Sequence, residues 1–209
     1  SRGLVGSEMC IRDSFKSWEL IVGKKIILLP GRLTAWKGQE MFLEALNKVN
    51  IQLGNDAFIA VILGNDQGRD LYKKKLIRLV EQYRLTKQIR FIDHCKNMPL
   101  AYKISDIVIS ASIEPEAFGR VSVEAQSMQK MIVASNLGGS NETVIDGKTG
   151  ILFEAGNSDE LSEKIIKVMN MDPNEISKMG NNGRENALKK FNVEKMCFST
   201  YSEYKKLFN

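Results

Sequence analysis

The segment at residues 114–124 reads Glu-Pro-Glu-Ala-Phe-Gly-Arg-Val-Ser-Val-Glu and holds two carboxylates, Glu116 and Glu124, separated by seven residues. The apolar run at residues 107–109 predicts a buried strand before it, and apolar residues at helical spacing predict a buried helix after it. Glu116 therefore falls in a strand-to-helix loop, and Glu124 falls within the helix. With Gly119 at the helix start, free backbone N–H groups and the helix dipole favour a bound anion beside this loop.

The spacing of these two carboxylates disfavours one enzyme class. A glycosidase needs its two carboxyl groups about 5 to 10 Å apart and facing one bond. Helical spacing across this interval predicts a separation of about 12 Å. Paired acid–base hydrolysis is therefore disfavoured. A purely structural alternative also exists, in which Glu116 caps the helix and Glu124 is solvated.

The composition indicates one globular domain with a mixed surface charge. A chain of 209 residues with 43% hydrophobic content can bury one good core. Its 30 basic and 25 acidic residues are interspersed, and the lysine run at residues 73–75 falls on the polar side of a predicted helix. We therefore predict no nucleic-acid partner. Cys10, Cys95 and Cys197 lack metal-ligand spacing and cannot all pair, which indicates a reducing compartment and no metal site.

The chain shows no signal for membrane insertion or secretion. No apolar run approaches the roughly 18 residues of a membrane span, and no charged start precedes an apolar core. We therefore expect a cytoplasmic location. Residues 1–14 show neither helical nor strand periodicity and are typical of an engineered linker or an interdomain segment. We expect a leader at residues 1–23 and one domain at residues 24–209.

From Lys24 onward, short apolar runs alternate with longer amphipathic segments, a pattern typical of βαβ units around a parallel sheet. The predicted strands are 26–29, 58–63, 89–92, 107–110, 131–134 and 150–153. The predicted fold class is α/β, a Rossmann-like doubly wound parallel sheet of about six strands. In such sheets, ligands bind beyond the carboxyl ends of the strands.

The first predicted strand leads into Gly31, Arg32 and Lys37, and these residues suit phosphate binding. Gly31 allows a sharp turn, the planar Arg32 guanidinium fits a phosphate, and Lys37 places a cation at the next helix start. The segment is not a Walker loop, because the glycine spacing and the Lys-Ser/Thr pair are absent. It is not a dinucleotide fingerprint either, because Gly-x-Gly-x-x-Gly is absent.

Three other strand ends carry candidate residues. Gly64 follows the second strand and allows close backbone approach. His94, the only histidine, follows the third strand, and a packing or capping role is favoured over a catalytic one. After the fifth strand, Gly138 and Gly139 predict a tight turn with positive φ, followed by a helical turn that Ser140 or Asn141 could cap.

Together these elements resemble one enzyme family. The Glu116-x7-Glu124 motif and the Gly31-Arg32-x4-Lys37-Gly38 element resemble those of retaining, nucleotide-sugar-dependent glycosyltransferases of the GT-B fold, the family-four type. The resemblance covers residues 24–209 approximately. One departure lies between the helix and the fifth strand, where relatives usually read Met-Gly-x-Pro and this chain reads Met-Gln-Lys-Met at residues 128–131.

The resemblance implies a role for each candidate residue. The catalytic residues would be Arg32, Lys37 and Glu116. Of these, Arg32 and Lys37 would bind the donor diphosphate, and Glu116 would contact sugar hydroxyls. Glu124 would accept hydrogen bonds from ribose hydroxyls. The remaining substrate-binding candidates are backbone groups and loop positions near the nucleotide, sugar or base: Gly31, Gly64, His94, Phe118, Gly119 and Arg120. His94 stands in the loop that holds the base edge, where relatives often have glycine.

The resemblance also implies an incomplete enzyme. The GT-B fold has two Rossmann-like domains, and this sequence resembles the carboxy-terminal, donor-binding one, so the amino-terminal acceptor domain is missing. The complete enzyme would transfer a sugar with retention from a nucleotide-diphosphate sugar to a hydroxyl acceptor of the glycan, lipid-linked or lipopolysaccharide type. It would need no metal or cofactor, and the full enzyme could contact the inner face of a membrane. The alternatives are a nucleotide-sugar binding module without turnover and one half of a GT-B-type epimerase or phosphorylase. A nicotinamide enzyme is disfavoured by the missing fingerprint.

Overall fold

The structure, a computed structural model, describes residues 16–208, so the expectation for residues 1–14 lies outside the described part of the chain. Strands and helices alternate along the described chain as expected up to β6, and three helices follow that strand. In order they are β1 (Lys25–Pro30), the 3-10 helix η1 (Ala35–Lys37), α2 (Gln39–Leu53), β2 (Phe58–Leu63), α3 (Asp70–Gln82), β3 (Ile89–Ile92), α4 (Met98–Ile104), β4 (Ile107–Ser110), α5 (Arg120–Ser127), β5 (Met131–Ser135), α6 (Ser140–Thr143), β6 (Ile151–Phe153), α7 (Ser158–Met169), α8 (Pro173–Lys190) and α9 (Val193–Lys206).

The described strands form one six-stranded sheet in the order β3-β2-β1-β4-β5-β6, and every pair is parallel. Each predicted strand is present to within one residue at either end. The sheet order steps outward from β1 in one direction and from β4 in the other. This is the order of a doubly wound Rossmann-like sheet, so the predicted fold class is confirmed.

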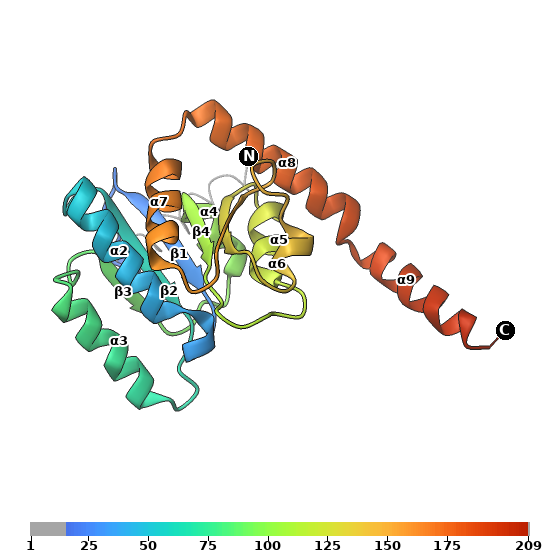
Figure 1. Ribbon diagram of the computed structural model, residues 1–209, viewed down its shortest axis with the longest axis horizontal. Coiled ribbons are helices and arrows are strands. Elements are labelled where there is room, and N and C mark those ends of the chain that lie inside the picture. The colour runs from blue at the N-terminus through green and yellow to red at the C-terminus, as the bar shows by residue number, and fades with distance from the viewer. Residues whose placement is uncertain (1–15, 209) are drawn as a thin grey trace.

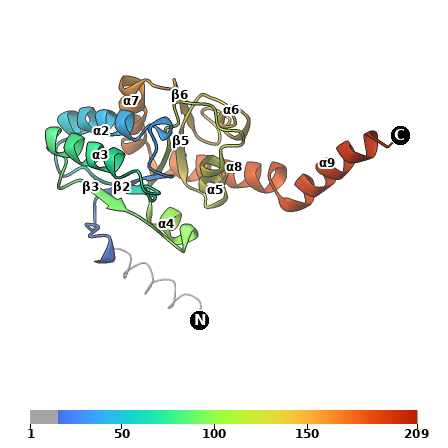
Figure 2. The same cartoon turned by 90° about the horizontal axis from the view of Figure 1, so that it is seen from below.

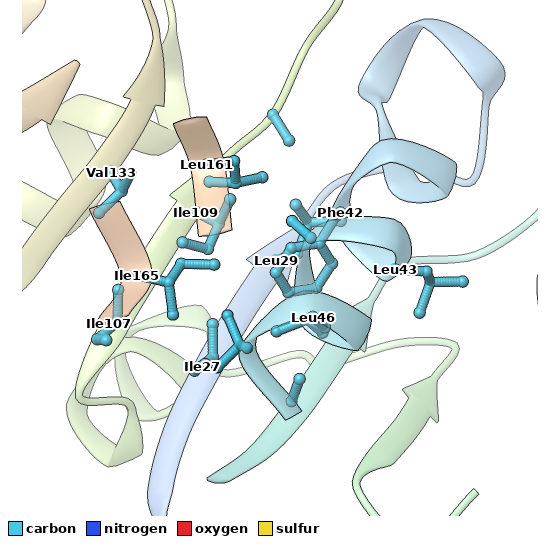
Figure 3. Packing of buried hydrophobic residues seen from close by; sticks show 14 of the residues in the cluster. Ile27, Leu29, Phe42, Leu43, Leu46, Ile107, Ile109, Val133, Leu161 and Ile165 are labelled. Atoms are coloured by element: carbon cyan, nitrogen blue, oxygen red, sulfur yellow. The ribbon is translucent and has the colours of Figure 1, made fainter. Parts of the chain in front are cut away.

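Helices cover both faces of the sheet, and each face has its own hydrophobic core (Figures 1 and 2). Alternate residues of β1 point to opposite faces, as strand geometry requires. Ile27 and Leu29 join the core beneath α2, α3 and α7, which Figure 3 shows from close by. Ile26 and Leu28 join the other core, which α4 and α5 cover. Burial on both faces explains why the strands have continuous apolar sequences.

Two segments at the ends of the described chain differ in packing. Leu20, within the segment that we expect to be a leader, is buried in the core on the α4 and α5 face. Helix α9 has no buried residue, and it extends away from the rest of the molecule in both views (Figures 1 and 2). Its apolar side chains are therefore exposed over its whole length: Val193, Met196, Phe198, Tyr201 and Tyr204, followed by Leu207 and Phe208.

Two turns of the chain need unusual backbone conformations. The expected turn after β5 has one positive φ, 56° at Gly138. The backbone of Gly139 then caps α6 without a side-chain hydrogen bond, so the expected cap by Ser140 or Asn141 is wrong: Ser140 is already the first helical residue. In the segment between α5 and β5, where the sequence departs from the Met-Gly-x-Pro pattern, Gln129 has φ 57°, a conformation that favours glycine.

We predict that Gln129→Gly stabilises the fold by about 0.5 to 1 kcal/mol, because it removes the Cβ strain of a left-handed backbone. Thermal or urea unfolding measures the change. The Gln129 amide donates to Asn181 Oδ1 at 2.7 Å, and Gln129→Ala removes that bond while keeping the Cβ. Gln129→Ala should therefore not stabilise. A loss of stability in Gln129→Gly equal to that in Gln129→Ala would contradict the strain argument.

Candidate functional site

A pocket of about 520 Å³ opens at the carboxyl ends of β1 and β4, between the loops that follow these strands. It gathers eight of the ten predicted site residues, and only Gly64 and His94 lie outside it. The lining residues are Pro30, Gly31, Arg32, Trp36, Lys37, Met98, Tyr102, Glu116, Ala117, Phe118, Gly119, Arg120, Val121 and Glu124.

A larger hollow of about 1110 Å³ lies at the opposite edge of the sheet. Its lining includes Lys24, Asp56 and Gln88, which lie one or two residues before the starts of β1, β2 and β3. This hollow is therefore at the amino ends of the strands. Ligands of open α/β sheets bind at the carboxyl ends of the strands, where β1 and β4 diverge. Position in the fold therefore favours the smaller pocket as the functional site, despite its smaller volume.

The two loops of the pocket are joined by an ion pair. Lys37 Nζ lies 2.7 Å from Glu116 Oε1, although the two residues are 79 positions apart in sequence. Their side chains are only 14% and 15% exposed. Screening by water is therefore weak, and the pair holds a cation and a carboxylate next to each other at the pocket wall.

Two further side chains fix this ion pair. The Ser112 hydroxyl donates a hydrogen bond to the same Glu116 oxygen, Oε1. The Lys37 ammonium group lies 4.4 Å from the centre of the Trp36 ring, within the range of a cation–π interaction. Each member of the ion pair therefore has a second contact: Glu116 is held by Ser112 from its own loop, and Lys37 is held by the neighbouring Trp36 ring.

The loop that carries Arg32 is held through its backbone. The Arg32 carbonyl accepts a hydrogen bond of 2.8 Å from Nε2 of the buried Gln39, whose Oε1 accepts from the Tyr72 hydroxyl at 3.2 Å. The Arg32 side chain itself is exposed at the pocket. Its guanidinium group can therefore turn toward a ligand while the backbone stays fixed.

Glu124 also lines the pocket, and each of its carboxylate oxygens has a hydrogen-bond partner. Oε2 accepts a hydrogen bond from the Tyr102 hydroxyl at 2.7 Å, and Oε1 accepts from Arg120 Nη2 at 2.9 Å. Burial, and then the hydrogen bond to Glu124, raises the pKa of the Tyr102 phenol well above its usual value. Tyr102 therefore stays protonated and acts as the donor.

The start of α5 also lines the pocket. Gly119 is the N-cap residue of α5 with φ 73°, and its backbone conformation brings the first N–H groups of the helix to the pocket. The neighbouring Phe118 is 47% exposed and meets Phe191 edge to face, with ring centroids 5.6 Å apart. The loop that carries Glu116 and Phe118 therefore packs against the junction of α8 and α9.

The two predicted residues outside the pocket have other positions. His94 is exposed in the loop after β3. Gly64 packs so closely that a Cβ there would lie 1.9 Å from the Gly31 carbonyl oxygen. Gly64 thus allows the loops after β1 and β2 to touch, which supports the position of Gly31 from behind.

Sequence reasoning missed six lining residues of the pocket, Pro30, Trp36, Met98, Tyr102, Ala117 and Val121, and it missed Ser112, which bonds to Glu116. Ser112 and Trp36 stand beside residues that were selected, so their closeness in sequence was an available signal. Met98 and Tyr102 lie one helical turn apart on α4, and both read as core residues. No sequence pattern connects Tyr102 to Glu124, which lies 22 residues further along.

Within residues 16–208, no helix is long and apolar enough to cross a membrane. In the same residues, no three His, Cys, Asp or Glu side chains converge as a set of metal ligands.

Known proteins resemble the chain over most of its length. Residues 11–186 match the family model described as Glycosyl transferases group 1. An uncharacterized glycosyltransferase of Methanocaldococcus jannaschii, MJ1069, is 31% identical over 98% of this chain and 48% of its own length. The chain thus spans about half the length of this relative.

Solved glycosyltransferase structures share the fold, and two of them show the extent of the similarity. A glycosyltransferase from Rickettsia africae superposes with a TM-score of 0.90 and 29% identity, covering 96% of this chain and 52% of the other. Anabaena HepE, solved in complex with UDP-glucose, superposes with a TM-score of 0.84 and 26% identity, covering 94% of this chain and 52% of the other. The chain therefore belongs to the group 1 glycosyl transferases, as a carboxy-terminal domain of the GT-B type.

Proposed function

We propose that residues 24–209 are the donor-binding domain of a retaining glycosyltransferase. The complete enzyme transfers a hexose from a nucleotide-diphosphate sugar to a hydroxyl acceptor on a glycan or a lipid-linked saccharide. The observation that carries the proposal is the pocket between β1 and β4, which brings three cationic residues, Arg32, Lys37 and Arg120, together with the carboxylates Glu116 and Glu124. HepE, whose structure contains UDP-glucose, supports a nucleotide-sugar donor.

The donor diphosphate lies between the two loops in this proposal. Arg32 offers a planar fork to phosphate oxygens, and Lys37 offers a compact cation. The N–H groups at the start of α5, after Gly119, add the positive end of a helix dipole. These groups neutralise the charge that builds up on the departing diphosphate, so no metal or other cofactor is needed for this step.

The sugar and the ribose occupy opposite ends of the pocket. Glu116, held by Lys37 and Ser112, accepts hydrogen bonds from sugar hydroxyls. Backbone groups from Phe118 to Arg120 orient the sugar and the phosphate. Glu124 accepts hydrogen bonds from the ribose. We assign the base to the loop after β3 near His94, beside Met98 in the pocket wall.

A second domain supplies the acceptor site. The chain spans about half the length of its relatives, 48% of MJ1069 and 52% of the Rickettsia africae enzyme. Helix α9 supports the presence of a second domain, because its exposed apolar residues are typical of a surface that another domain buries. We propose that the amino-terminal domain packs against α9 and forms the far wall of the cleft.

We infer a cytoplasmic location, at the inner face of a membrane when the acceptor is lipid-linked. The free thiols of Cys95 and Cys197 support a reducing compartment. A nucleotide-sugar binding module without turnover is the second candidate function. It is favoured by one observation, since every pocket residue assigned above serves the donor.

The diphosphate role of the cations is testable by calorimetry. We predict that Arg32→Ala weakens binding of nucleoside diphosphates at least tenfold, because a hydrogen bond to a charged group contributes about 1.5 to 3 kcal/mol. Lys37→Ala should weaken it similarly. Binding of the nucleoside alone should hardly change. The thermal midpoint of Arg32→Ala should also stay constant, because its side chain is exposed.

The matched control is Arg78→Ala, which removes the same charge from the exposed side of α3, outside the pocket. It should leave nucleotide affinity unchanged at constant ionic strength. If Arg32→Ala reduces nucleoside and diphosphate binding equally, or if Arg78→Ala has the same effect, the phosphate assignment is wrong.

The need for a second domain gives another prediction. The 209-residue chain should bind donor nucleotide yet transfer no detectable sugar, because nothing positions the acceptor, and proximity alone contributes about 7 to 11 kcal/mol to lowering the barrier. Radiolabelled donor with a panel of glycan and lipid-linked acceptors measures transfer. Robust transfer by the monomeric chain would contradict the two-domain requirement.

A further inference from the structure

The two hydrogen bonds to Glu124 differ in rigidity. Arg120 is 82% exposed at its side chain and stands four residues before Glu124 on the same helix. Exposed pairs of this kind contribute little and exchange readily with water. Tyr102 is only 2% exposed and comes from a different element, α4. The bond from Tyr102 is therefore the one that ties Glu124 to the body of the domain.

Tyr102 is itself firmly placed. Helix α4 begins at a side-chain cap, in which Asn97 Oδ1 accepts from the Leu100 N–H at 3.2 Å, and Pro99 lies in its first turn. The Tyr102 ring belongs to the same buried cluster as Leu28 and Val108. Because the ring is locked in the core, its hydroxyl marks a fixed point on the pocket wall.

The remaining hydrogen-bonding capacity of Glu124 has a specific form. An ionised carboxylate offers about four acceptor positions, two on each oxygen. Tyr102 uses one on Oε2, and Arg120 uses one on Oε1. Each oxygen therefore keeps one acceptor, and Glu124 faces the pocket. Two adjacent acceptors on one rigid carboxylate match two adjacent hydroxyl donors.

We propose that Tyr102 is a positioning residue that holds Glu124 so that both of its oxygens accept from the vicinal 2′- and 3′-hydroxyls of the donor ribose. This inference rests on the proposed function of the pocket. It makes α4, as well as α5, part of the nucleotide site. Tyr102 touches no substrate in this arrangement and acts only through Glu124.

The test compares ribonucleotides with their 2′-deoxy analogues by calorimetry on the 209-residue chain. The probes are uridine, adenosine and guanosine diphosphates, each with its 2′-deoxy partner. Tyr102→Phe should weaken ribonucleotide binding about threefold to tenfold, the range expected for one hydrogen bond. It should weaken deoxynucleotide binding by less than about twofold, because one of the two donors is already missing.

A mutant cycle tests whether Tyr102 acts through Glu124. In a Glu124→Ala background, Tyr102→Phe should cause no further loss of ribonucleotide affinity. The control Tyr83→Phe removes a hydroxyl from a tyrosine outside this pocket and should change neither affinity. Arg120→Ala removes the other partner of Glu124 and should keep the ratio of ribonucleotide to deoxynucleotide affinity.

The outcomes separate this inference from the proposed function. Equal losses for both nucleotide classes in Tyr102→Phe, or losses that add to those of Glu124→Ala, overturn the positioning role alone. If Tyr102→Phe does not fold, a change of the affinity ratio in Arg120→Ala overturns it instead. If the unmodified chain binds none of the nucleotides, the proposed function is wrong and this inference with it.

Discussion

The parallel pairing of β1 with β4 is the constraint on which the site depends. It places Ile27 opposite Ile107 and Leu28 opposite Val108, at the point where the strand order reverses. The chain leaves these two strands in opposite directions, so their following loops diverge and leave a crevice. In this protein one loop brings Lys37 and the other brings Glu116. Residues far apart in sequence thus become a single charged site through the topology of the sheet.

The ion pair in that crevice is poorly explained as a stabilising contact. Removing two charges from water costs several kcal/mol per ion, which their attraction offsets only with good geometry and further hydrogen bonds. Ser112 provides a further hydrogen bond to Glu116, and Trp36 provides a cation–π contact to Lys37. A site that must receive an anionic ligand benefits from this arrangement, because the cation is already oriented and partly free of water before binding.

The sequence was sufficient for the strands and for most of the pocket, because both depend on local patterns. Apolar runs bounded by turn residues located all six strands, and the carboxyl-end rule then selected Arg32, Lys37 and Glu116. Tyr102 was not predictable, since its ring satisfies the core pattern and only its hydroxyl serves the site. The role of Gly64 was also hidden, because contact with the Gly31 carbonyl depends on how neighbouring loops pack.

The pocket and the exposed α9 are connected by one aromatic contact. Phe118 follows Glu116 in the site loop, and its ring contacts Phe191, the C-cap residue of α8, two residues before the start of α9. An edge-to-face pair contributes about 0.5 to 1.5 kcal/mol beyond its buried area, which corresponds to at most about tenfold in a binding constant. A domain that packs on α9 therefore restrains the ring against which Phe118 leans. In the proposed two-domain enzyme, this Phe118–Phe191 contact links the covering of α9 to the ordering of the loop that binds the donor sugar. Its energy is large enough to change a binding constant measurably, but it is too small to account for the stability of the domain.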